Sequence, residues 1–151
     1  MAAALAAYLH YLAIFALFAL LTLEHRLLRL PLDLDRARSL VRIDAAYGIS
    51  AVLVLVTGGI RALWFAKGLD YYLHNALFHA KLGLFVLVGL LSIVPTVHLL
   101  RWRAPLKAGQ LPPLDAGQAR RLTLIIRLEL LLVLLLPLLA VLMARGYGVT
   151  G

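Results

Sequence analysis

Four long apolar stretches alternate with short polar segments along this 151-residue chain. They cover residues 3–23, 43–66, 79–100 and 122–144, and each is long enough to cross a bilayer as a helix. A backbone in lipid must satisfy its own hydrogen bonds, which favours helices. The connections are too short to form another domain. The pattern predicts an all-α fold, a four-helix transmembrane bundle that makes one integral membrane domain of residues 1–151.

Composition agrees with this prediction. Hydrophobic residues make up 64% of the chain, and the mean hydropathy is +0.96. A soluble domain of this size has no interior large enough for so much apolar surface. The chain has no cysteine, which excludes disulfides and thiolate metal sites. Imidazole, thioether and carboxylate groups remain as candidate ligands.

The basic residues mark the two sides of the predicted bundle. The formal charge is +8, and eleven of the fifteen lysine and arginine residues lie in two connections, 24–42 and 101–127. This grouping follows the positive-inside rule and argues against a nucleic-acid-binding face. We expect a multi-pass protein of a bacterial inner membrane, with both basic connections in the cytoplasm and both termini outside. The lipid bilayer is its expected partner, and a homo-oligomer is compatible with the pattern.

The two halves of the chain resemble each other. Leu-Pro-Leu-Asp at 30–33 and Pro-Pro-Leu-Asp at 112–115 precede similar segments, and each then reaches an Arg-x-acid triplet that ends at Asp44 or Glu129. The last match needs a short insertion. Two duplicated helical hairpins would explain this repeat. The alternative is that proline and aspartate commonly mark helix starts, without any duplication.

Candidate ligands lie near the predicted outer ends of three spans. His10 is about two turns into the first span, His79 opens the third, and Met143 is near the end of the fourth. A b-type haem takes axial His or Met ligands from facing helices, and Lys81 and Arg61 at the same end suit its propionates. These residues predict a haem b site ligated by His10 and His79, with Met143 as a substitute for one. Copper on the two histidines and ordinary packing are the alternatives.

Several short stretches carry a resemblance to a known family. The chain resembles, over nearly its whole length, a family of bacterial four-span membrane proteins of unknown function. More distantly, it is similar to HemJ-type protoporphyrinogen oxidases, and in general architecture to CopD-type copper-resistance membrane proteins. The HemJ-type resemblance implies b haem binding, and it rests on His10, His79 and Lys81. The family resemblance is carried by Ala7-Tyr8-Leu9-His10, Leu23-Glu24-His25, Phe78-His79-Ala80-Lys81-Leu82 and Met143-Ala144-Arg145-Gly146.

A second group of ionisable residues is expected near the inner ends of the spans. Glu129 lies about two turns inside the fourth span, where a lone carboxylate must be paired or protonated. We expect Arg42 or Arg127 to pair with Glu129 or Asp44. One interpretation is an ion-pair network that fixes helix register, and the other is a proton path or quinone-headgroup site. The whole predicted network comprises Glu24, His25, Arg42, Asp44, His98, Arg127 and Glu129.

Three functional hypotheses follow from these residues. The first is a haem-b-binding membrane redox protein, either an electron carrier or an oxidoreductase, with a quinone or another redox protein as its partner. The second is a copper-handling or transport protein that uses the same outer residues. The third is a structural subunit without a cofactor. The sequence does not decide whether the protein is an enzyme.

Overall fold

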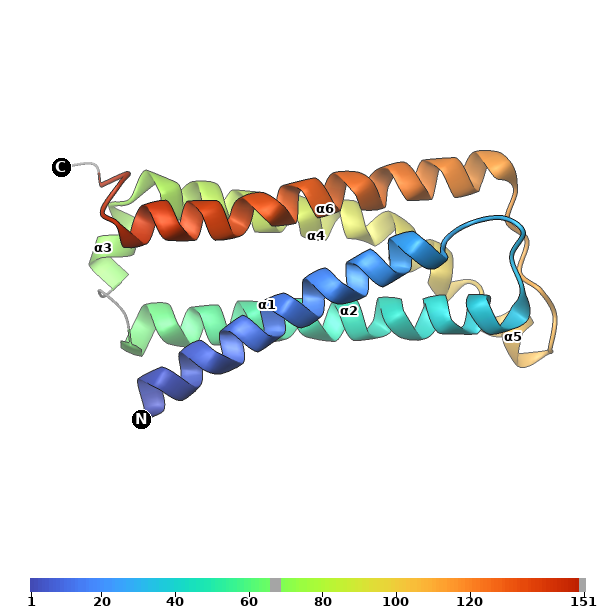
Figure 1. Ribbon diagram of the computed structural model, residues 1–151, viewed down its shortest axis with the longest axis horizontal. Helices are drawn as coiled ribbons and strands as arrows, with labels where there is room; N and C mark the ends of the chain where they lie inside the picture. The colour runs from blue at the N-terminus through green and yellow to red at the C-terminus, as the bar shows by residue number, and fades with distance from the viewer. Residues whose placement is uncertain (66–68, 150–151) are drawn as a thin grey trace.

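The computed structural model describes residues 1–65 and 69–149, and helices account for most of them. No β-strand is present in these ranges, so the predicted all-α class is confirmed (Figure 1). The helices are α1 (Ala2–Leu27), α2 (Leu34–Ile60), the π-helical turn η1 (Arg61–Phe65), α3 (Leu69–Leu73), α4 (Ala76–Leu100), α5 (Arg103–Lys107) and α6 (Ala116–Ala144).

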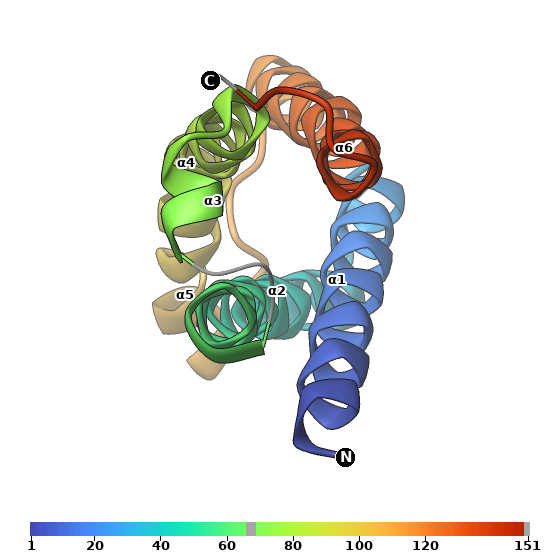
Figure 2. The same ribbon diagram turned by 90° about the vertical axis from the view of Figure 1, so that its left-hand side faces the viewer.

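The long helices form two hairpins. Helix α1 packs along α2, and α4 packs along α6. The two pairs close into a four-helix bundle (Figures 1 and 2). Both chain ends lie at one end of the bundle, and the connections 28–33 and 101–115 lie at the other (Figure 1). We call the end with the chain termini the terminal end, and the opposite end the loop end.

The four membrane-spanning helices are longer than the apolar stretches that predicted them. The segments extend over residues 2–27, 34–65 (α2 with η1), 76–107 (α4 with the following turn and α5) and 116–144, and Ala66, the last residue of the predicted second span, lies outside the described residues. The difference arises because polar caps start three helices inside the polar segments. As a result Arg36, Arg38 and Arg42, predicted in a connection, lie on α2.

Aspartate caps begin both second helices of the hairpins. Asp33 accepts a 2.8 Å hydrogen bond from the Arg36 backbone N–H, and these contacts with Arg36 lower the pKa of the exposed Asp33 carboxyl. Asp115 and Gln118 form a reciprocal capping box at the start of α6. Such caps satisfy backbone N–H groups that have no partner within the helix.

These caps set a common register for the two hairpins. Four, seven and fourteen residues after the caps, both helices bury a side chain: Ala37 and Ala119, Leu40 and Leu122, Tyr47 and Glu129. Eleven residues after the caps, Asp44 corresponds to Ile126, and both are buried. The sequence match of Asp44 with Glu129 therefore does not describe equivalent helix positions. The burial pattern itself agrees with a duplicated hairpin.

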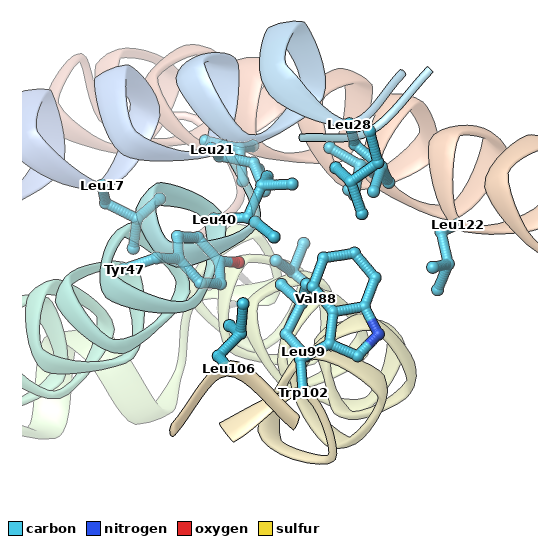
Figure 3. Close-up of a cluster of buried hydrophobic side chains, with 14 residues drawn as sticks. Leu17, Leu21, Leu28, Leu40, Tyr47, Val88, Leu99, Trp102, Leu106 and Leu122 are labelled. Atoms are coloured by element: carbon cyan, nitrogen blue, oxygen red, sulfur yellow. The ribbon is translucent and has the colours of Figure 1, made fainter. Parts of the chain in front are cut away.

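The best-packed part of the bundle lies toward the loop end. Leu21, Leu40, Leu99 and Ile126 bring one apolar side chain from each long helix into this core, which also contains Trp102 (Figure 3). Many large apolar side chains elsewhere on the four helices are exposed. In water such a surface would aggregate, so it faces the lipid bilayer.

A small polar junction closes the terminal end. Asn75 is fully buried, caps α4 and donates to the Tyr147 carbonyl at 3.1 Å. The Ala76 N–H donates to the Gly148 carbonyl at 2.8 Å. Gly148 has φ +81°, and a Cβ there would lie 2.6 Å from Leu77 Cγ, so only glycine fits. The junction joins the end of α6 to the start of α4.

Candidate functional site

Three carboxylates from three helices lie in the part of the bundle toward the loop end. They are Glu24 on α1, Asp44 on α2 and Glu129 on α6, and we call them the carboxylate cluster. Glu24 lies within electrostatic reach of both other members, and Glu129 lies within reach of Asp44. The sequence predicted that these residues belong together, and the structure brings them together.

Burial is the most unusual property of the carboxylate cluster. The exposed fractions are 1% for Glu24, 5% for Asp44 and 0% for Glu129. One carboxylate oxygen of Glu24 and both oxygens of Glu129 are buried without any hydrogen-bond partner. An ionised carboxylate in such surroundings is very costly, and three like charges in one apolar interior cannot all exist together. We therefore expect the cluster to hold protons.

Asp44 differs from the two glutamates because it has a defined partner. The Thr96 hydroxyl on α4 donates to Asp44 Oδ1 at 2.7 Å. Arg103 on α5 lies within electrostatic reach of the same carboxylate. The buried Tyr47 ring lies one turn along α2 from Asp44 and within electrostatic reach of all three cluster members. Asp44 is thus the member best able to carry a negative charge.

The predicted ion pairs of this region do not form, which corrects the sequence analysis. Arg127 donates from Nε to His25 Nε2 at 3.0 Å instead of pairing with a carboxylate. Arg42 is exposed. Arg127 and Glu129 are two residues apart, about 200° around α6, so they point to opposite sides. Among the described residues, the ion pairs are confined to the surface pairs Arg36–Asp33, Arg38–Asp35 and His74–Asp70.

His98 stands apart from the carboxylate cluster. Its Nε2 is buried without a hydrogen-bond partner, and its ring lies edge-on to Trp102, with centroids 5.6 Å apart. It borders a hollow of about 370 Å³ between α4 and α6, beside Arg101 and Arg121. His98 was predicted as part of the intramembrane network, and the structure shows no hydrogen bond or ion pair between it and the three carboxylates.

A second group of residues lies near the terminal end. His10 is buried on α1, on the same face as Glu24 but about 21 Å away along the helix axis at 1.5 Å per residue. Its Nδ1 lies 2.9 Å from Thr57 Oγ1, and the Thr57 hydroxyl donates to the Leu53 carbonyl at 2.6 Å. Because that hydroxyl has one proton, it accepts from His10 Nδ1–H. His10 Nε2 is then the unprotonated ring nitrogen.

Two cations accompany His10. Lys81 on α4 is half-buried within electrostatic reach of His10 and Arg61. The Arg61 guanidinium lies 5.4 Å from the centre of the Tyr11 ring, a cation–π distance. The sequence prediction that these residues share one end of the bundle agrees with the structure.

His79 and Met143 differ in their surroundings. His79 is exposed, and its Nε2 lies 2.9 Å from the Leu73 carbonyl. The reason is rotational: His79 precedes the buried Val88 by nine residues, about 180° around α4, whereas Lys81 precedes it by seven and shares its face. Met143 is buried, and its carbonyl accepts from the Tyr71 hydroxyl at 2.9 Å.

The residues at the terminal end therefore fit a metal or haem site only in part. Within residues 1–65 and 69–149, no three His, Cys, Asp or Glu side chains are grouped to hold a metal ion. His10, whose Nδ1 is engaged by Thr57, fits the role of a single axial ligand through Nε2. His79 does not fit as its partner in this conformation, because its Nε2 already binds Leu73.

Sequence reasoning missed four contributors to these sites. They are Tyr47, Thr57, Thr96 and Arg103. Tyr47 could have been found, since it lies three residues after Asp44 on the same helix face. Thr57 and Thr96 gave no signal, because a threonine in a membrane helix ordinarily bonds its own backbone and its contacts depend on the neighbouring helix.

Comparison with known proteins gives a family but no characterised relative. A family model described as "Predicted membrane protein (DUF2214)" matches residues 2–148 of the 151-residue chain. No curated protein and no solved structure matches significantly. The resemblance to a family of membrane proteins of unknown function is thus confirmed.

Proposed function

The chain belongs to the DUF2214 family of predicted membrane proteins, and from that premise we propose that it conducts protons across the membrane by way of its carboxylate cluster. The observation that carries the proposal is the burial of Glu24 and Glu129 with carboxylate oxygens that have no hydrogen-bond partner. Ionisable groups inside membrane helices are expensive and are commonly retained for ion or proton handling.

The chemistry follows from the difference between the three members. Glu24 and Glu129 have carboxylate oxygens without a hydrogen-bond partner and suit the neutral, protonated form. Asp44 instead accepts a hydrogen bond from Thr96 and lies near Arg103. The three carboxyls are coupled electrostatically, so the protonation of one depends on the charge of the others. A quinone, whose reduction consumes protons, is the partner that this chemistry would serve. If the loop end faces the cytoplasm, the cluster exchanges protons with the inner side of the membrane.

Proton flux into vesicles tests the proposal. Purified protein is reconstituted into liposomes that contain a pH-sensitive dye, and a potassium gradient with valinomycin sets the membrane potential. We expect a dye response above that of protein-free liposomes. Glu24→Gln and Glu129→Gln, which keep the side-chain shape but cannot ionise, should lower the flux at least tenfold. This loss corresponds to about 1.4 kcal/mol in the transfer barrier.

The matched control is Asp35→Asn. Asp35 is also near the loop end, but its side chain is 96% exposed. Its flux should equal that of the wild type. Equal flux in wild type, Glu129→Gln and protein-free liposomes would contradict the proposal and leave the three carboxylates with a structural role.

A haem-b redox protein is the second candidate, and one observation favours it. The Thr57 contact fixes the His10 ring with its Nε2 unprotonated, which is the state that ligates iron. His10 would hold the haem, and Lys81 and Arg61 would pair with its propionates. Haem would supply one-electron chemistry when bound.

The visible spectrum of detergent-purified protein tests the second candidate. We expect a Soret band when haem is supplied during expression, and His10→Ala should remove it. His74→Ala is the control, because His74 lies on the exposed surface of the α3–α4 connection. A Soret band that survives in His10→Ala would contradict haem ligation by His10.

A further inference from the structure

A hollow of about 640 Å³ lies at the loop end between the end of α1 and the start of α6. Its polar lining consists of His25, Arg26, Arg29, Arg120, Thr123 and Arg127, and no acidic residue lines it. We call it the arginine groove. Its volume is within the range of small-molecule sites, roughly 300–1,000 Å³.

The positive charges of the arginine groove are not neutralised by the protein. Among the described residues, none of the ion pairs involves these four arginines. The Arg29 carbonyl accepts from the Arg36 side chain at 3.1 Å, and no residue in the described ranges forms an ion pair with the Arg29 guanidinium. Four like charges around one hollow repel each other, so an anion that enters it is favoured.

One of the four arginines is already oriented. Arg127 uses Nε to donate to His25 Nε2 at 3.0 Å, which leaves its two terminal nitrogens available. Ala116 and Ala119 of the first turn of α6 also line the groove. The start of α6 itself is already capped by Asp115, so the arginine side chains are the donors that suit phosphate oxygens.

The apolar part of the lining indicates what the phosphate is attached to. Leu28, Leu30 and Leu124 line the groove together with the arginines, and Leu30 and Leu124 are exposed. The groove also lies where two helices long and apolar enough to cross a membrane end and begin, which is where lipid headgroups are expected. We propose that the arginine groove binds the phosphate headgroup of an anionic phospholipid, whose acyl chains cover these leucines.

Thermal unfolding in detergent micelles tests this site. The probes are phosphatidylglycerol, phosphatidylcholine and inorganic phosphate, each titrated against the purified full-length protein. We expect phosphatidylglycerol to raise the melting temperature in a saturable way, and phosphatidylcholine to raise it much less. The double variant Arg29→Gln/Arg120→Gln should bind phosphatidylglycerol roughly 30-fold more weakly, from the usual contribution of a basic residue at an anionic lipid surface.

The matched control is Arg38→Gln. This variant loses the same charge near the loop end, but Arg38 is half-exposed, pairs with Asp35 and does not line the groove. Its phosphatidylglycerol affinity should stay within twofold of the wild type. An equal loss in Arg38→Gln, or equal stabilisation by both lipids, would overturn the proposal. Stabilisation by inorganic phosphate as strong as that by phosphatidylglycerol would also overturn it, in favour of a free-phosphate site.

Discussion

Thr96 on α4 donates a 2.7 Å hydrogen bond to Asp44 on α2, and this bond joins the two hairpins beside the carboxylate cluster. Each hairpin is held internally by long helix–helix contacts, but α2 and α4 touch over a much shorter length. A single polar bond between them therefore matters more than the same bond within a hairpin. It also sets Asp44 apart from the two unpartnered glutamates.

Thr96→Val should destabilise the protein by about 1–3 kcal/mol, because it leaves a buried carboxylate oxygen without its donor. The measurement is thermal or denaturant unfolding in detergent. Ser92→Ala is the control, since Ser92 on the same helix is bonded to the Gly89 carbonyl within its own helix. Equal stability of Thr96→Val and Ser92→Ala would show that the bond between the hairpins contributes little.

Gly58→Ala should displace the His10 ring. A Cβ at Gly58 would lie 3.1 Å from His10 Cε1, whereas a Cβ at Gly59 would meet nothing within 4 Å. We expect Gly58→Ala to shift the imidazole NMR signals of His10 and to lower stability by roughly 1 kcal/mol or more, as overpacking does. Gly59→Ala should leave the His10 signals unchanged and raise stability by up to about 1 kcal/mol, because alanine is the better helix former. Identical His10 signals in the two variants would mean that α1 and α2 are farther apart at this point than the 3.1 Å distance indicates.

Stability at acid pH should report the Asp33 cap. Contacts with Arg36 lower the pKa of Asp33 below its usual value of 3.8. The contribution of the ionised cap to the free energy of unfolding is therefore complete above pH 3.8. It is lost as the pH falls through the lower pKa that Asp33 has in the folded state. The difference in melting temperature between wild type and Asp33→Asn should be constant above pH 4 and shrink below it. A difference that grows on acidification would contradict the cap.

Cysteine labelling tests which end of the bundle faces the cytoplasm. The chain has no native cysteine, so single substitutions report one site each. From the distribution of basic residues we expect an impermeant reagent on intact cells to label Ala3→Cys and to miss Ala108→Cys. Both positions are exposed, at opposite ends of the bundle. The reverse pattern would place the arginine groove and the carboxylate cluster toward the outside.

The sequence supports prediction of the spans and the charged residues better than prediction of their contacts. Hydropathy alone finds the four helices, because lipid demands continuous apolar runs. Glu129 is also predictable as special, since a carboxylate in such a run is rare, whereas Glu24 falls just outside the predicted span 3–23 and its complete burial was not predicted. Their lack of ion pairs is not predictable, because it depends on the rotation of each helix. The same rotation turns His79 outward and Lys81 inward on α4.

Helix α2 also carries small residues whose contacts could not be predicted from the sequence. Gly48, Gly58 and Asp44 fall on one helical face by spacing, which suggests one continuous contact. In the structure Gly48 is exposed and Gly58 meets His10, and α1 packs along α2 at an inclination (Figure 1). The crossing angle is set by side-chain packing along both helices and cannot be derived from one of them.

Infrared spectroscopy of the reconstituted protein at neutral pH tests the central claim, that the carboxylate cluster holds protons. A protonated carboxyl group in an apolar site gives a carbonyl-stretch band that is separate from the bands of ionised carboxylates and of amides. We predict this band in the wild type, with a shift in deuterium oxide, and its stepwise loss in Glu24→Gln, in Glu129→Gln and in the double variant. A wild-type spectrum with ionised carboxylates only, unchanged by either substitution, would contradict the account.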